Sequence, residues 1–160
     1  MIKQMHRLIV LAFIAPVLLS AQASTQDDLQ TDIVKLESLL KQGAVRKVKV
    51  LHVHDSTATR VAVNKKALLS IANITLDVSD QIAEKFGPLL SGVSVKKEDH
   101  SPDLRWGVFF YDANGKEIGS LFVDKFGQCG YLNNQTVSFE INTSERDLAK
   151  RLHKITTIRD

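Results

Sequence analysis

The chain has little of several residue types, and each scarcity excludes a class of protein. Its 160 residues include one cysteine, three prolines and one tryptophan. A single cysteine excludes an internal disulfide, so an apolar core must hold the fold together. The longest apolar run, residues 8–19, falls well short of the roughly 20 residues of a membrane-spanning helix. We therefore expect no permanent membrane anchor.

The familiar catalytic motifs and a strong positive charge are also missing. The sequence has no glycine-rich phosphate loop, no Gly-x-Ser-x-Gly elbow, no His-Glu-x-x-His and no Cys-x-x-Cys. Removing Lys3 and Arg7 from the 21 basic residues leaves a net charge of +1 against 18 acidic residues. No cluster of Lys and Arg with interleaved aromatics remains. The sequence therefore favours a function without catalysis, cofactor or nucleic acid.

Lys3 and Arg7 belong to a segment with the three parts of a secretory signal peptide. They precede the apolar run, and the small residues Ala21 and Ala23 follow it. This order is typical of a leader that is removed on export. We expect residues 1–23 to be cleaved, the product to be periplasmic or secreted, and residues 24–160 to form one domain.

The first half of that domain mixes helical and strand patterns. Apolar residues recur every three or four positions from Leu29 to Leu40, which predicts an amphipathic helix over residues 26–42. Residues 44–54 and 73–80 alternate and predict strands, and between them Asn64 can cap a short helix over residues 65–72. A helix from residue 81 should break at Gly87 and Pro88. Residues 93–103 are polar and weakly patterned, which predicts an exposed loop.

Residues 104–141 carry the clearest pattern in the chain. Three turn signals, beginning at Asp112, Asp124 and Asn133, separate four alternating segments, so they predict a four-strand meander. The Asp-x-x-Gly punctuation is typical of turns, because Asp bonds its own backbone and Gly accepts positive φ. We therefore predict an α+β fold, in which this meander and one or two N-terminal strands form an antiparallel sheet with helices on one face.

The C-terminal segment predicts a last helix. Ser144 can act as its N-cap, with Asp147 at the capping-box position. Leu148, Leu152 and Ile155 make an apolar stripe. The cations between them, Arg151 included, are expected to form an ordinary solvated face.

Two sets of residues are candidates for chemistry. His52 and His54 share one face of a predicted strand and could donate two imidazoles to Zn or Cu, with His100 as a further ligand. The alternative interpretation is a strand end with exposed histidines. Cys129 could support thiol chemistry, although a lone Cys in a strand usually behaves as a small hydrophobic residue.

The run "DLRWGVFFYDANGKEIGSLFVDKFGQCGY", residues 103–131, resembles small exported bacterial domains of no assigned activity, some of which act as inhibitors or immunity proteins. It covers only part of the chain and transfers no functional residue. The resemblance implies a binding module rather than an enzyme.

The surface of the meander offers the candidate binding residues. Trp106, Val108 and Phe110 should face the helices, which leaves Phe109, Tyr111, Leu121 and Tyr131 on the outer face. That face is more apolar than contact with water requires, so either the flanking helices cover both faces of the sheet or the patch marks an interaction site. We predict that Phe109, Tyr111 and Tyr131, with His100 and Asp103 of the adjacent loop, bind a protein partner. The helix over residues 26–42 could also mediate a homodimer.

Overall fold

The computed structural model describes residues 25–54, 56–142 and 147–157, so the expected signal peptide lies outside the described residues. The elements of the described part are, in chain order, α1 (Gln26–Lys41), β1 (Lys47–His52), α2 (Lys65–Ile71), β2 (Ile74–Val78), α3 (Ile82–Leu90), β3 (Val93–Lys97), β4 (Leu104–Tyr111), β5 (Glu117–Asp124), β6 (Cys129–Leu132), β7 (Gln135–Ile141) and α4 (Leu148–Thr157). The predicted α1, α2 and meander are confirmed.

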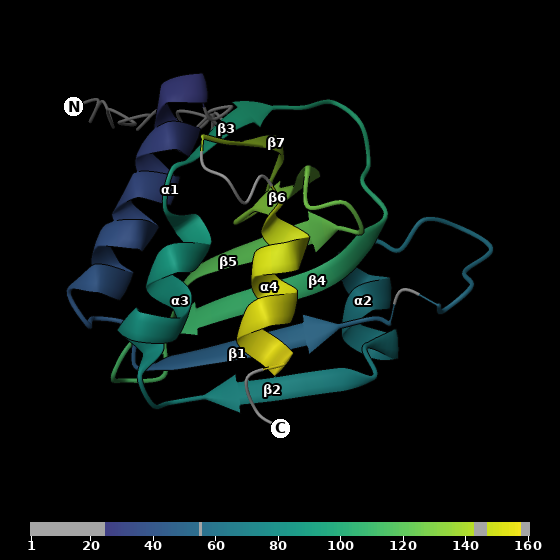
Figure 1. The fold of residues 1–160 in the computed structure, drawn as a ribbon. Helices are drawn as coiled ribbons and strands as arrows, with labels where there is room; N and C mark the ends of the chain where they lie inside the picture. Colours follow the sequence, from purple (N-terminus) through teal and green to yellow (C-terminus); the bar gives the residue numbers. More distant parts are fainter. Residues whose placement is uncertain (1–24, 55, 143–146, 158–160) are drawn as a thin grey trace, which may run out of the picture.

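The strands form one antiparallel sheet in the order β2-β1-β4-β5-β6-β7-β3 (Figure 1). The meander supplies the four consecutive strands β4 to β7, and β1 with β2 extends the sheet beyond β4. The predicted α+β class with an antiparallel sheet and flanking helices is therefore confirmed.

The meander turns are closed by the chemistry that the sequence predicts. Asp112 Oδ1 accepts hydrogen bonds from the backbone N–H groups of Asn114 and Lys116, at 2.8 and 2.9 Å. Gly115 follows with φ of 74°. Asp124 repeats the arrangement, accepting from the amides of Gln128 and Cys129. These aspartates are occupied in stabilising turns.

Helices lie on both faces of the sheet, not on one face as predicted. On one face α1, α3 and α4 cover the main core, which includes Trp106, Val108 and Phe110 (Figure 1). On the opposite face, which we call the outer face, α2 places Leu68 against Phe122 in a second, smaller core. The outer face of the meander is therefore partly covered.

The strand register corrects the predicted position of Leu121. Leu121 pairs with Val108 and is fully buried in the main core, so it faces inward. Phe122 takes the outer position instead. The β4–β5 pairing shifts register between Phe110 and Tyr111, and this irregularity changes which residues of β5 share a face with those of β4.

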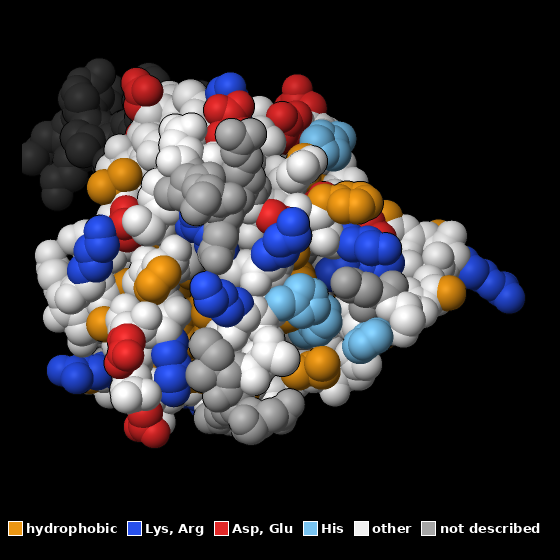
Figure 2. Space-filling model, in the orientation of Figure 1, with side chains coloured by type: hydrophobic (Ala, Val, Ile, Leu, Met, Phe, Trp, Pro, Cys, Tyr) orange, Lys and Arg blue, Asp and Glu red, His pale blue; other side chains and the backbone are white. Residues whose placement is uncertain are grey.

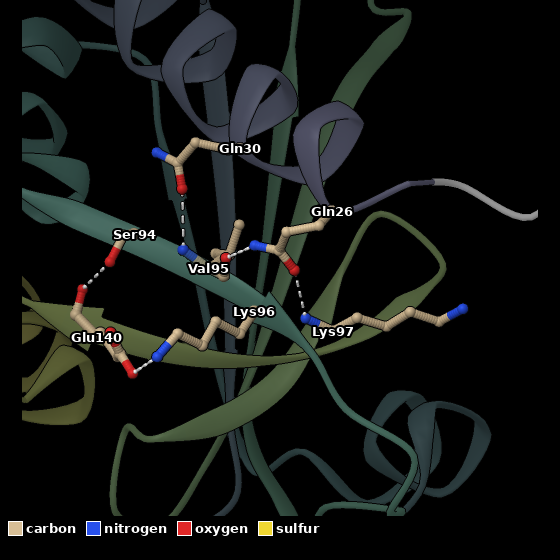
Figure 3. A network of polar contacts seen from close by, with 7 residues as sticks. All are labelled: Gln26, Gln30, Ser94, Val95, Lys96, Lys97 and Glu140. Atoms are coloured by element: carbon tan, nitrogen blue, oxygen red, sulfur yellow. Dashed lines mark hydrogen bonds and ion pairs between the residues drawn. The ribbon is translucent and has the colours of Figure 1, made fainter.

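The predicted loop at residues 93–103 begins with an edge strand. β3 pairs with β7 and buries Val93 and Val95. Two glutamines of α1 occupy its other edge (Figure 3). Gln30 Oε1 accepts from Val95 N at 3.1 Å, and Gln26 accepts from Lys97 N at 2.9 Å while donating to the carbonyl of Val95. The glutamine side chains thus bond backbone groups of β3 that could otherwise pair with a strand of another molecule.

Replacing both Gln26 and Gln30 with alanine should destabilise the fold by about 2 kcal/mol, because three modest hydrogen bonds are lost. The Val95 and Lys97 amides should then exchange with deuterium faster than in the parent, which hydrogen-exchange mass spectrometry can measure. Gln42→Ala is the matched control, since Gln42 Nε2 bonds only within its own helix region, to Ser38 Oγ. Unchanged exchange at β3 in the double variant would contradict the proposed protection.

The contact between α3 and α4 differs from the prediction in two ways, the continuity of α3 and the burial of Arg151. α3 continues through Pro88 to Leu90 instead of breaking at Gly87. Arg151 is only 7 % exposed, not solvated, and its Nη1 donates to the carbonyls of Pro88, Leu89 and Ser91 at 2.9–3.0 Å. Asp147 caps α4 by accepting from Ala149 N at 2.8 Å. The predicted cap Ser144 lies outside the described residues.

Candidate functional site

Part of the outer face of the sheet lies at the margin of the α2 core and is only partly covered by it. Its residues are Lys47, Lys49, Phe109 and Tyr111, which we call the outer strip. Lys47 pairs with Tyr111 and Lys49 with Phe109 across β1 and β4, so each cation lies beside an aromatic ring on one face. Lys47 is exposed and the other three are half-buried. The aromatic side chains of the strip are of the kind that is enriched at protein interfaces.

The polar groups of the outer strip are held by their neighbours. Lys47 Nζ lies 3.3 Å from Asp77 Oδ1 on β2. Burial raises the pKa of Tyr111, and the nearby Glu117 carboxylate raises this pKa further, against the opposing effect of Lys47. The Tyr111 hydroxyl therefore stays protonated at neutral pH and can both donate and accept a hydrogen bond.

Two of the predicted aromatics, Phe109 and Tyr131, pack against the second core. The Phe109 ring meets the Phe122 ring edge to face, with 5.3 Å between centroids. Lys65 Nζ lies 4.9 Å from the centroid of Tyr131 and donates to Asn134 Oδ1 at 3.0 Å. Burial lowers the pKa of Lys65, which Glu117 partly offsets. Tyr131 thus packs with Lys65 at the margin of the second core.

The loop residues His100 and Asp103 have different environments. His100 is exposed and its Nδ1 lies 3.3 Å from Glu98 Oε2. Asp103 Oδ1 accepts from Val63 N at 2.7 Å, and Oδ2 pairs with Arg105 Nη2 at 2.9 Å. Arg105 also donates to the carbonyl of Thr57. The geometry gives Asp103 a structural role, which is to join the segment before α2 to the start of β4.

The two candidate metal-ligating histidines belong to a larger aromatic cluster. His52 is buried and stacks on Trp106 with 3.6 Å between centroids, so the interpretation of two exposed histidines holds only for His54. His153 of α4 meets both rings edge to face. Figure 2 shows histidines gathered beside α4. The sequence pattern gave no sign that His153 belongs to this cluster. Helix α4 is far from β1 and β4 along the chain, and it contacts them only in the folded protein.

This cluster does not complete a metal centre within the described residues. The His52 and His54 ring centroids are 6.3 Å apart. Among the described side chains, no group of three or more His, Cys, Asp and Glu residues is arranged to hold a metal ion. Structural zinc sites need four ligands and catalytic sites usually three. His52 and His54 therefore have no third protein ligand in this part of the chain.

Cys129 is also poorly suited to nucleophilic chemistry. It lies half-buried in β6. Burial raises the pKa of its thiol, and the carboxylates of Asp124 and Glu98 raise it further. A reactive cysteine needs the opposite environment, one that stabilises the thiolate.

A groove of about 320 Å³ lies between α3 and α4 on the helical face. Its lining combines apolar side chains with charged ones: Gln81, Glu84, Lys85, Pro88, Leu89, Arg151, Lys154 and Ile155. The Arg151 guanidinium already donates hydrogen bonds to carbonyls at the end of α3. At this position the side chain therefore holds the two helices together. The groove brings together no acid, base and nucleophile in a catalytic arrangement.

No protein-family model matches this chain, and no match was found among curated proteins or solved structures. Within the described ranges, every helix is too short or too polar to cross a membrane.

Proposed function

We propose that this chain is an exported, non-catalytic protein-interaction module of the inhibitor or immunity type, and that the outer strip contacts its partner. The observation that carries the proposal is the pairing of half-buried Phe109 and Tyr111 with Lys49 and Lys47 on the outer face of the sheet, where Phe109 packs at the margin of the α2 core. Interfaces are enriched in such aromatics, which supply a large apolar area and, in Tyr, a polar group.

The rigidity of the strip supports the same proposal. All four of its side chains project from paired strands, and Phe109 is anchored on Phe122. A preformed surface loses little conformational entropy on binding, so its contacts translate efficiently into affinity. An inhibitor or immunity protein must hold such a surface ready before it meets its target.

Tyr111→Ala should weaken partner binding by about thirtyfold, the effect of losing roughly 2 kcal/mol at an interface hot spot. The partner is first isolated by affinity capture from a periplasmic extract of the source organism, and its affinity is then measured by calorimetry. Phe126→Ala is the matched control, because Phe126 is an aromatic residue that is 64 % exposed in the turn between β5 and β6. It should bind as the parent does.

Circular dichroism and thermal unfolding of both variants separate binding from folding. The proposal fails if the captured protein binds the folded Tyr111→Ala variant as tightly as the parent. It also fails if the parent captures no protein beyond those held by an unrelated exported domain.

A further inference from the structure

The segment between β1 and α2 contains a loop that projects from the rest of the molecule (Figure 1). Residues 56–62, with the sequence STATRVA, belong to no helix or strand, and most of them are exposed. Val61 is 78 % exposed although its side chain is apolar, so it contributes nothing to the core. Loops that a rigid scaffold displays in this way commonly carry a binding function.

The two ends of this loop are anchored on β4. Val53 N donates to Arg105 O, and Leu104 N donates to Val63 O, each at 2.9 Å. Val53 and Val63 are both buried, and they belong with Leu104 to the second core. The chain thus leaves the side of β4 at Val53 and returns to it at Val63, so the loop has a fixed base.

An ion pair, which we call the clamp, closes the base of the loop a second time. Asp103 Oδ1 accepts from Val63 N, and Asp103 Oδ2 pairs with Arg105 Nη2. Arg105 Nη1 in turn donates to the carbonyl of Thr57, and Thr57 N donates to His54 O at 2.8 Å. Arg105 is only 6 % exposed, so water competes little for its bonds. A loop held at both ends loses little conformational entropy on binding.

Arg60 is the only charged residue within residues 56–64, and it is exposed. The other residues of the loop are Ser, Thr, Ala and Val, which all have short side chains. A trypsin-like serine endopeptidase takes one substrate side chain into a primary pocket that contains an aspartate. A guanidinium can bond such a carboxylate through two parallel hydrogen bonds. One long basic side chain among short ones therefore suits the active-site cleft of such an enzyme.

We infer that residues 56–62 occupy the active-site cleft of a serine endopeptidase of trypsin-like specificity and inhibit it, with Arg60 in the acidic primary pocket. The inference rests on the inhibitor type of the proposed function and adds the class of target. It uses a surface other than the outer strip, because the loop and Tyr111 lie at opposite ends of the paired strands β1 and β4.

The clamp gives a physical reason for inhibition instead of digestion. Attack of the enzyme's serine on the Arg60 carbonyl forms an ester and breaks the bond to Val61, whose nitrogen receives the serine proton through the enzyme's histidine. In a flexible substrate the new amine diffuses away, and water then hydrolyses the ester. Here Val63 is anchored two residues beyond the break. The amine therefore stays beside the ester, re-forms the peptide bond and returns the serine.

The test uses the full chain, purified after export, with trypsin as the probe and a chromogenic arginine substrate as the reporter. The parent should inhibit trypsin stoichiometrically, and Arg60→Ala should weaken inhibition at least about hundredfold, as the loss of an interface hot spot does. Arg60→Leu should lose trypsin and gain chymotrypsin, whose primary pocket is hydrophobic. Lys66→Ala is the matched control, since Lys66 is an exposed cation of α2 just beyond the loop, and it should inhibit as the parent does.

A further variant tests the clamp. Asp103→Asn keeps the size of the side chain but removes the charge that holds Arg105, so trypsin should cleave the Arg60–Val61 bond at least about tenfold faster than in the parent. Mass spectrometry measures this cleavage, and circular dichroism should show that the fold is retained.

Four outcomes overturn the inference. They are a parent that does not inhibit trypsin at micromolar concentration, an Arg60→Ala variant as inhibitory as the parent, rapid cleavage of the parent at Arg60–Val61, and equal cleavage of Asp103→Asn and the parent. None of them changes the Tyr111 test, which measures the affinity of the captured partner for the outer strip. Failure of the Tyr111 test likewise leaves the result with trypsin as it stands.

Discussion

Replacing Gly130 with alanine should destabilise the fold by more than about 4 kcal/mol, the range of exceptional substitutions. A Cβ at this position would lie 1.8 Å from the backbone oxygen of Phe122 on the neighbouring strand β5. No side-chain rotation relieves a clash with backbone, so β6 must move away from β5. Urea unfolding followed by circular dichroism would measure the loss, which should leave little folded protein at 37 °C.

Gly87→Ala is the matched control for this prediction. Gly87 lies inside α3, and apart from its chain neighbours and its own helix backbone an added Cβ there meets no atom within 4 Å. Alanine lowers the conformational entropy lost when a helix forms, but the following Pro88 disfavours helical backbone at a residue with a Cβ, so this variant should differ from the parent by less than about 1 kcal/mol. Equal effects of the two glycine substitutions would show that backbone proximity at β6 is not what excludes a side chain.

Replacing Arg151 with methionine should cost about 3 kcal/mol and lower the midpoint of thermal unfolding by roughly 10 °C. Methionine retains much of the apolar stem, so the loss isolates the guanidinium. Three carbonyls at the end of α3, those of Pro88, Leu89 and Ser91, lose a buried charged donor. Differential scanning calorimetry measures both quantities.

Lys150→Met tests whether charge alone explains the effect. Lys150 is the neighbouring cation on α4 and is exposed, so its replacement should change stability by less than about 0.5 kcal/mol. If Arg151→Met is as mild as Lys150→Met, then Arg151 does not hold α3 against α4. An Arg151→Lys variant should recover only part of the loss, because an ammonium cannot match the fork of a guanidinium.

The candidate site was only partly accessible to sequence reasoning. Alternation correctly placed Phe109 and Tyr111 on the face opposite Trp106, because side chains along one strand alternate by geometry. It could not reveal that Lys47 and Lys49 of a distant segment would pair with them. It also could not show that Phe109 and Tyr131 pack against the second core, or that the Lys65 ammonium lies near the Tyr131 ring. Each of these facts depends on which strands become neighbours.

Local features of this protein follow directly from short stretches of its amino-acid sequence. Asp112 with Gly115, and Asp124 with Gly127, specify two of the meander turns, and Asn64 specifies the start of α2. These features involve groups within a few residues of one another, so the local chain is sufficient to encode them.

The packed fold, and no local pattern, sets the strand order, the register of Leu121, the burial of Arg151 and the glutamine bonds at the β3 edge. Each of these depends on contacts between segments far apart in the chain, such as Gln26 with Val95 and Arg151 with Leu89. A polar residue on a helix has the same sequence pattern whether it faces water or caps another element. The choice depends on what packs against it, because a buried polar group is stable only where it finds its partners.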